Sequence, residues 1–267
     1  MASPNPYTDD LRLAHILADS ADRVSLQAFK SVSAGHMEGV QLKEDGSAVT
    51  AADREVEQLI RAQLSRVRTR DGIVGEEFGS TGTAARQWVI DPIDGTANFM
   101  RGVPVWATLI ALLDQGEPVV GVVSAPALGR RWWAVRGGGA YAGKSLSSAS
   151  RLSISAIESL EDSSLTYASL AGWGDRREPF VELLDSVKRS RGFGEFWAYM
   201  LMAEGAVDIA VEPGLEIYDK AALVPIVREA GGIITSLDGS EPLDSDGLLA
   251  AVPALHEQVV QRLNPAN

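Results

Sequence analysis

The chain has 267 residues, 45% of them hydrophobic and 22% charged, which predicts a globular protein large enough for two lobes around a shared cleft. Its formal net charge of −12 argues against nucleic acid as a partner, and the absence of cysteine excludes disulfides and thiolate nucleophiles. No apolar run approaches the ~20 residues of a membrane span, and residues 1–10 do not resemble a signal peptide, so we expect a cytoplasmic protein without a membrane partner.

The first half of the chain predicts helices packed on an antiparallel sheet. Apolar residues recur at helical spacing in two segments, residues 9–31 and 51–67. Thr50 precedes the second helix as its expected N-cap. Short apolar runs bounded by turn residues predict strands at residues 72–76, 87–90, 104–114, 117–125 and 131–136.

The second half of the chain predicts an α/β lobe. Gly137-Gly138-Gly139 and the small residues 143–150 indicate a boundary, so we divide the chain into residues 1–142 and 143–267. Beyond the boundary, strands and helices alternate. Strands are expected at residues 164–167, 207–211, 233–235 and 248–252. Helices are expected at residues 178–189, 195–204 and 219–230, and from residue 254 onward.

Acidic residues gather in three segments of this map. Glu76 lies in Gly75-Glu76-Glu77, Asp91 and Asp94 lie in the run of residues 88–99, and Asp219 opens a predicted helix. Each segment alone is weak, because two aspartates three apart are usually part of a turn and a lone aspartate is often a helix cap. The argument therefore depends on the twelve-residue run taken whole.

That run combines metal ligands with a place for an anion. Asp91 comes where the buried strand ends, and a turn stiffened by Pro92 brings Asp94 to the same side. Gly95 permits close backbone approach, and Thr96 starts a short helix whose free N–H groups face an anion. Carboxylate oxygens suit Mg²⁺, which commonly shares phosphate oxygens with a substrate. The segment therefore predicts a magnesium site beside a phosphate cradle.

Taken in order, these segments resemble the signatures of the inositol-monophosphatase superfamily, and the resemblance runs from about residue 49 to residue 232. It implies a layered α-β-α-β-α sandwich, mixing α+β and α/β features, with the active site between the lobes. It also implies a phosphomonoesterase for a small phosphorylated metabolite, two to three Mg²⁺ ions in each active site, and a homodimer. One departure is Tyr218, which stands where the family usually has tryptophan.

The resemblance also implies a role for each site residue. The implied metal ligands are Glu76, Asp91, Asp94, Asp219 and the backbone carbonyl of Ile93. Asp53 and Thr96, together with Glu76, would orient a metal-activated water for in-line attack on phosphorus. The backbone amides of Gly95 and Thr96 would hold the phosphate, and Glu212 would contact the leaving alcohol. The metal bound by Asp91, Asp94 and Asp219 would neutralise the leaving alkoxide.

Three other segments point to a substrate class. Residues 103–112, 191–200 and 203–210 resemble the histidinol-phosphate phosphatases of this superfamily. Histidinol phosphate carries an amine and an imidazole, and Glu195 and Glu212 could pair with these cationic groups. The histidinol-phosphate phosphatases usually have aspartate at the position of Glu195. Arg191 would either lie near the phosphate or form a surface ion pair, and the aromatic stripe from Phe196 onward would either line the pocket or belong to the core.

Several alternatives stay open at this stage. An inositol or other sugar-alcohol monophosphatase is the nearest, followed by a 3′-phosphoadenosine-5′-phosphate or fructose-bisphosphate phosphatase. A non-catalytic phosphate-binding homologue would be expected to lack metal ligands, and none is lost here. Aspartyl-phosphate phosphatases resemble Asp-x-Asp, with one residue between the acids, whereas two residues separate Asp91 from Asp94.

Overall fold

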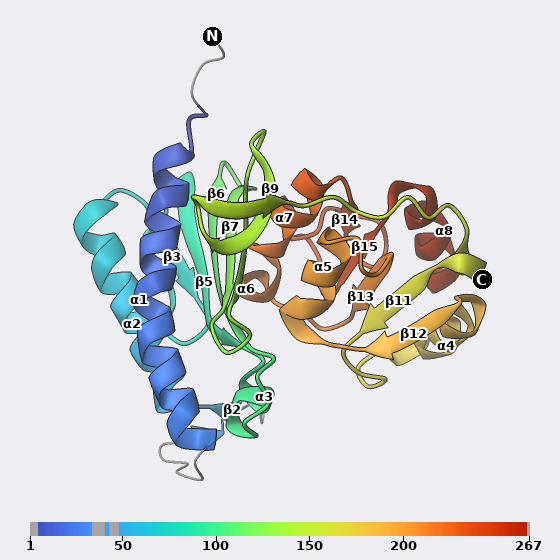
Figure 1. Cartoon of the computed structure of the whole chain (residues 1–267), viewed down its shortest axis with the longest axis horizontal. Coiled ribbons are helices and arrows are strands. Elements are labelled where there is room, and N and C mark those ends of the chain that lie inside the picture. The colour runs from blue at the N-terminus through green and yellow to red at the C-terminus, as the bar shows by residue number, and fades with distance from the viewer. Residues whose placement is uncertain (1–4, 34–40, 43–47, 266–267) are drawn as a thin grey trace.

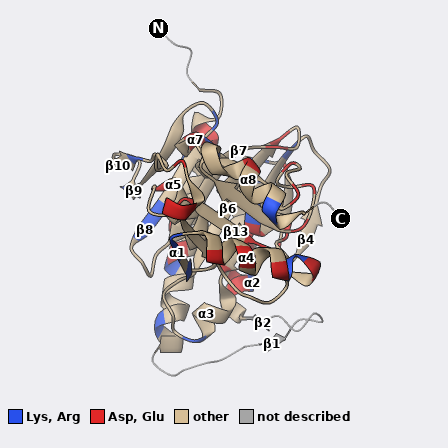
Figure 2. Cartoon of the chain, turned by 90° about the vertical axis from the view of Figure 1, so that its right-hand side faces the viewer, with Lys and Arg blue, Asp and Glu red and all other residues tan. Residues whose placement is uncertain are grey.

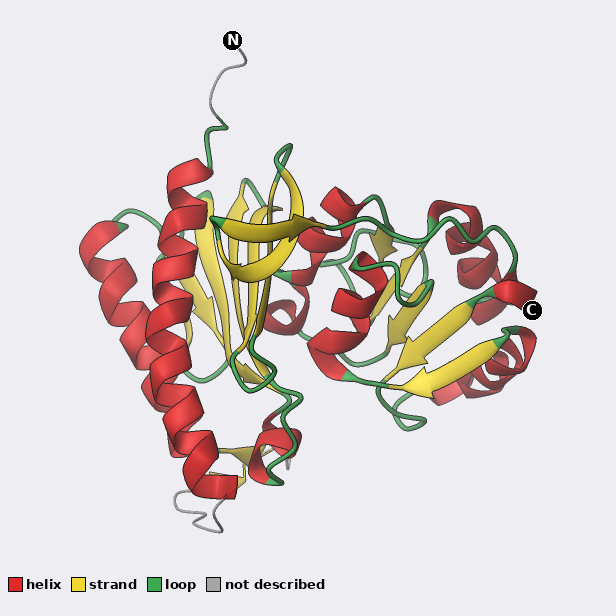
Figure 3. Ribbon diagram, in the orientation of Figure 1, coloured by secondary structure: helices red, strands yellow, loops and turns green. Residues whose placement is uncertain are grey.

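Helices and sheets alternate in five layers (Figure 1; Figure 3). The structure, a computed structural model, describes residues 5–33, 41–42 and 48–265. The helices are α1 (Thr8–Ser33), α2 (Ala51–Val67), α3 (Thr96–Met100), α4 (Arg177–Ser186), α5 (Glu195–Ala203), α6 (Ile217–Lys220), α7 (Leu223–Ala230) and α8 (Pro253–Leu263). The strands are β1 (Gln41–Leu42), β2 (Ala48–Val49), β3 (Gly72–Gly75), β4 (Gly79–Thr81), β5 (Arg86–Asp94), β6 (Ala107–Asp114), β7 (Glu117–Ala125), β8 (Arg130–Val135), β9 (Gly139–Ser145), β10 (Ser148–Arg151), β11 (Ser164–Tyr167), β12 (Arg189–Gly192), β13 (Ile209–Glu212), β14 (Ile233–Thr235) and β15 (Leu248–Ala251).

Two sheets form the body of the protein. The larger has eight strands in the order β10-β9-β8-β7-β6-β5-β3-β4, and the smaller has five in the order β12-β11-β13-β15-β14. Helices α1 and α2 pack on the outer face of the larger sheet, while α5, α6 and α7 lie between the sheets and α4 and α8 pack together beyond the smaller one. The expected α-β-α-β-α sandwich is therefore confirmed.

Apolar periodicity explains this layering. On α1, buried residues recur at helical spacing and form one core with α2 and the larger sheet; they include Leu11, Ala14, Leu17, Ala18 and Ala21. A second core fills the space between the sheets and takes in the whole stripe Phe196, Tyr199, Met200 and Ala203 of α5. This stripe belongs to the core rather than to a pocket.

The structure differs from the sequence-based expectation at several places. Strand β3 pairs in parallel with β5, so the larger sheet is mixed rather than antiparallel. The helix expected over residues 219–230 is split into α6 and α7, because Pro225 has no N–H to extend the first helix through residues 221–222. Helix α4 ends at Ser186 rather than residue 189, and Arg189 instead begins the edge strand β12.

The chain leaves the larger sheet later than expected. The boundary placed between residues 142 and 143 falls inside β9, and β10 adds one more strand to the same sheet before the chain crosses over after Arg151. The division into two lobes as separate units stays a prediction.

Acidic residues are distributed over several elements, α4 among them (Figure 2). Among the described helices, none has the length and apolar character needed to cross a membrane.

A buried polar cluster joins α1 to the larger sheet. Arg131 is 7% exposed, and its guanidinium donates to Ser124 Oγ at 2.9 Å and to Asp22 Oδ2 at 2.7 Å. His15 lies beside it, with Nδ1 3.2 Å from Arg131 Nη1 and the ring 4.8 Å from that of Trp133. Burial, and then the Arg131 charge, lower the pKa of His15 to about 4. His15 is therefore neutral at pH 7.

This His15 pKa predicts acid sensitivity of the fold. Because the pKa is about 4 in the folded chain and about 6.5 when unfolded, protonation favours unfolding, and the stabilisation is complete above pH 6.5 and lost as pH falls toward 4. We expect His15→Gln to remove about 3 kcal/mol of this pH dependence between pH 7 and pH 4. Denaturant unfolding of both proteins from pH 7 to pH 4 measures it, and parallel pH curves would contradict the assignment.

Candidate active site

A bulge in β5 brings two aspartates to one face. In a regular strand, residues three apart point to opposite faces of the sheet. The register of β5 against β6 shifts here, since Asp91 faces Leu109 and Asp94 faces Ala107, so three steps along β5 match two along β6. The extra residue turns Asp94 to the side of Asp91. The expected juxtaposition is thus found, made by a bulge rather than by a turn.

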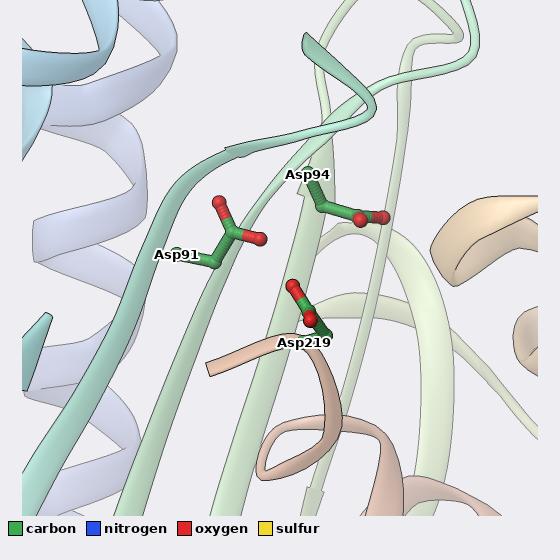
Figure 4. Close-up of side chains that lie close together, drawn as sticks. All are labelled: Asp91, Asp94 and Asp219. Atoms are coloured by element: carbon green, nitrogen blue, oxygen red, sulfur yellow. The ribbon is translucent and has the colours of Figure 1, made fainter. Parts of the chain in front are cut away.

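Asp219 completes a cluster of three carboxylates. It comes from α6, which packs against β5, and its ligand oxygens and those of Asp91 and Asp94 all lie within 4.8 Å of one another. Figure 4 shows the three side chains close together, with the carboxylates of Asp91 and Asp219 turned toward each other. Burial raises the pKa of Asp91 well above its ordinary value, and the nearby charges of Glu76 and Asp94 raise it further. Burial and the charge of Asp219 do the same to the pKa of Asp94.

Glu76 reaches this cluster through the parallel pairing of β3 and β5. Gly75 pairs with Ile90, so the next residues along the two strands, Glu76 and Asp91, emerge together at the same edge of the sheet. The Glu76 N–H donates to Ile90 O at 3.2 Å and continues the ladder by one step. The carboxylate of Glu76 therefore lies close enough to raise the pKa of Asp91.

Asp53 takes part in the capping box of α2 and also contacts Thr96 of the candidate site. It is fully buried, and its Oδ2 accepts from the Thr50 N–H at 2.9 Å in a capping box that starts α2, which confirms Thr50 as the N-cap. Its other oxygen, Oδ1, accepts from Thr96 Oγ1 at 3.2 Å. Burial raises the pKa of Asp53 to about 6, helped by the charge of Glu76. Asp53 therefore lies beside Thr96 with a pKa near the neutral range.

The turn after Asp94 is tight and depends on glycine. Gly95 has φ +83° and precedes α3, and a Cβ there would lie 2.9 Å from Val105 O, so glycine is required. Thr96 Oγ1 also lies 2.9 Å from Ile93 O. Because a hydroxyl has one proton, Thr96 donates either to this carbonyl or to Asp53 Oδ1 at a given moment.

Two further acids line the side of the site nearest the smaller sheet. Glu195 begins α5 with an unusual φ of +48°, and the next N–H, that of Phe196, donates to Asp94 Oδ2 at 2.7 Å. Glu212 ends β13, and burial together with the charge of Glu195 raises its pKa to about 8. Glu195 and Glu212 also raise the pKa of Asp94, so these acids adjoin the three-aspartate cluster.

Arg191 is the candidate that the structure places apart. It lies on the edge strand β12 with its side chain exposed, and its Nη1 donates to Ser190 O at 2.6 Å. Among the described residues Arg191 forms no ion pair, and its expected place near the phosphate stays a prediction.

Sequence reasoning gave no role to two groups that shape the site. One is the Phe196 N–H, which could not be inferred because a backbone contact across 102 residues leaves no signal in side-chain type. The other is Asn98, whose amide donates to Val105 O at 3.0 Å and also bonds the Glu195 carboxylate, lowering the pKa of Glu195 against the effect of burial. The position of Asn98 two residues after Thr96 in the same motif could have indicated a role in the site.

The donor set fits a divalent cation. Among the described residues Asp91 Oδ1 is buried without a hydrogen-bond partner, and the largest causes that raise the pKa of Asp91 and Asp94 are burial and neighbouring carboxylates. One buried and two half-buried carboxylates this close cannot all be charged without a counter-charge. Carboxylate oxygens are the ligands that Mg²⁺ prefers in proteins, where it keeps several waters of its own.

The chain is similar to known proteins along nearly its whole length. The sequence model of the inositol monophosphatase family matches residues 11–266. A histidinol-phosphatase of Streptomyces coelicolor is 51% identical over 264 residues, which cover 97% of this chain and 98% of the relative. A histidinol-phosphatase of Mycobacterium tuberculosis is 51% identical over 96% of this chain and 98% of its own. The solved structure of an inositol monophosphatase from Zymomonas mobilis superposes with a TM-score of 0.85 at 33% identity, covering 97% of this chain and 99% of that one.

Proposed function

The chain belongs to the inositol monophosphatase family and is a phosphoric monoester hydrolase, and we propose that it hydrolyses histidinol phosphate to histidinol and inorganic phosphate with bound Mg²⁺. Histidinol phosphate fits the site because its alcohol carries two basic groups. The observation that carries the proposal is the pair Glu195 and Glu212 beside Asp94. Two bacterial relatives that share half of the sequence are histidinol-phosphatases and support the same choice.

Glu212 provides the sharper argument for a cationic substrate. Within the described part of the chain its Oε2 is buried without a hydrogen-bond partner, and its pKa of about 8 reflects the cost of charge there. An ammonium or imidazolium group would supply both the donor and the counter-charge that this carboxyl lacks. A neutral polyol would supply only a donor. The site therefore fits an amine-bearing alcohol better than a sugar alcohol.

Mg²⁺ would be held by Glu76, Asp91, Asp94 and Asp219, with the carbonyl of Ile93. Bound there, it would lower the pKa of a coordinated water and offset negative charge on the leaving alkoxide. The protein's own groups would orient the water, accept its proton and hold the phosphate. Thr96 and Asp53 orient the attacking water and take up its proton, since the Asp53 pKa of about 6 suits a base near neutral pH. The amides of Gly95 and Thr96 hold the phosphate for in-line attack.

The test compares two esters under one condition. With Mg²⁺, we expect phosphate release from histidinol phosphate at a kcat/KM at least ~10-fold above that from myo-inositol 1-phosphate, equivalent to about one well-placed ion pair. Removal of Mg²⁺ with EDTA should abolish both reactions, and re-addition should restore them. Preference for the inositol ester, or equal rates, would overturn the proposed substrate but leave the metal chemistry standing. Activity that persists in EDTA would overturn the metal assignment.

A cytoplasmic site of action and a homodimer are part of the same proposal. The cytoplasmic site follows from the sequence, and the homodimer follows from the resemblance to the family alone.

A further inference from the structure

One face of α2 carries three charged residues at four-residue spacing, Asp53, Glu57 and Arg61. Residues four apart lie above one another on a helix, so the three point in one direction. That face is inside the protein, since Glu57 is fully buried and only 14% of the Arg61 side chain is exposed. Asp53 belongs to the site already described, whereas Glu57 and Arg61 do not touch the three aspartates.

Glu57 and Arg61 bind the hairpin that carries Glu76. The Glu57 carboxylate accepts the N–H of Glu77 at 2.7 Å and that of Phe78 at 3.3 Å, and it accepts Arg61 Nε at 2.7 Å. Arg61 in turn donates to Gly79 O and, at 3.1 Å, to Thr81 Oγ1. The loop between β3 and β4 is therefore tied to α2 by a buried carboxylate and a guanidinium.

The Glu57 carboxylate also packs directly against Gly75, the residue before Glu76. A Cβ at Gly75 would overlap the Glu57 carboxylate, so a larger residue there would displace Glu57 from its hydrogen bonds. The backbone is then fixed on both sides of Glu76, because the Glu76 N–H donates to Ile90 O and the next two N–H groups are held by Glu57. The direction of Glu76 decides whether its carboxylate can reach a metal beside Asp91.

We propose that Glu57, braced by Arg61, is a positioning residue for the metal ligand Glu76. Glu57 sets the direction of Glu76 and, through the same helix face, its placement relative to Asp53. This inference rests on the magnesium site of the proposed function but not on the choice of substrate. An outer contact of this kind typically changes metal affinity by about 10–100-fold when it is lost.

A purely structural ion pair would behave differently. Breaking it would lower the melting temperature, while the folded fraction would bind Mg²⁺ as before. A matched control exists in Glu229, a carboxylate on α7 that accepts two backbone N–H groups, those of Gly137 and Gly139, at 2.7 Å each. These two glycines flank the start of β9, four strands from β5 in the sheet, so this second contact is remote from the acids.

The test is Mg²⁺ binding by calorimetry on the full chain without substrate, together with the Mg²⁺ concentration that half-saturates turnover. Glu57→Gln keeps the size of the side chain but loses its charge. We expect this variant to weaken Mg²⁺ binding by ~10-fold or more and to regain much of its kcat at high Mg²⁺, whereas Glu229→Gln lowers the melting temperature and leaves both Mg²⁺ readouts unchanged.

Two results would overturn the inference: Mg²⁺ affinity unchanged in Glu57→Gln, or weakened equally in Glu229→Gln. Should Glu57→Gln fail to fold, Arg61→Lys repeats the test, because it keeps the charge partner of Glu57 but loses the guanidinium fork. A threefold weaker affinity, roughly 0.65 kcal/mol, is then the smallest supporting effect. Absence of Mg²⁺ binding by the unmodified protein would overturn this inference and the metal assignment together.

Discussion

Asp94→Asn is expected to lower Mg²⁺-dependent phosphate release by at least ~100-fold, the scale found when one preorganised electrostatic group is removed. Asp94 adjoins Asp219, Glu195 and Glu212, so in the proposed mechanism its charge would help to hold the metal and would face the departing alcohol. The fold should tolerate the change, because asparagine still offers an oxygen to the Phe196 N–H that Asp94 now accepts at 2.7 Å. The loss should therefore lie in kcat rather than in the yield of folded protein.

A control for Asp94→Asn removes the same charge elsewhere. Asp162 forms an exposed pair with Lys188 at 3.8 Å, and such pairs contribute little to stability. Asp162→Asn should keep essentially full activity. Steady-state phosphate release and a thermal melt for each variant separate the effects. Retention of more than about a tenth of the activity by Asp94→Asn would overturn the assignment of this metal site, because a hundredfold loss is the smallest effect expected.

Glu195→Gln is expected to raise KM for histidinol phosphate by at least ~10-fold while changing KM for a neutral ester only a few-fold. Glutamine keeps a carbonyl that Asn98 can still bond, so the loop should hold its shape. What it loses is the charge that would pair with the amine or imidazole of the substrate. Losing one partner of a half-buried charge pair costs at least about 1.4 kcal/mol, a factor of ten in affinity.

The control for this specificity test lies near the other end of the same helix. Glu204 follows α5 and accepts from Arg130 at 2.6 Å, away from the site. Glu204→Gln should change both substrates alike. The informative quantity is the ratio of kcat/KM for histidinol phosphate to that for myo-inositol 1-phosphate. A Glu195→Gln variant with an unchanged ratio would show that this carboxylate does not select the substrate.

The sequence was most informative where pattern and chemistry coincide. Helix α2 was predicted with both of its observed ends, because the cap at Thr50 and the apolar spacing agree. The family resemblance carried by the run around Asp91 implied that Asp219, 128 residues away, shares a metal site with it, and the structure brings the carboxylates of Asp91, Asp94 and Asp219 together. Short motifs can therefore identify metal-ligand candidates even when these residues lie far apart in the chain.

Other features could not be predicted, because they depend on pairing. Strands β9 and β10 are built largely from glycine, alanine and serine, so they lack an apolar alternation, and they form because the larger sheet offers an edge. The bulge between Asp91 and Asp94 is visible only in the register against β6. The sequence does not distinguish Glu57 from other acidic residues on a helix. Its role depends on the hydrogen bonds that it accepts from the N–H groups of Glu77 and Phe78.

Asp53 and Asp219 each share their two oxygens between a helix start and the site. One oxygen of Asp53 accepts from Thr50 and the other from Thr96, while Asp219 Oδ2 accepts from the Glu216 N–H at 2.7 Å and its carboxylate also meets Asp91. Asparagine at either position would keep the capping oxygen and lose the charge. In the proposed mechanism, asparagine at either position would therefore remove catalytic activity while the chain stays folded. A homologue that binds its ligand without hydrolysing it would be one substitution away.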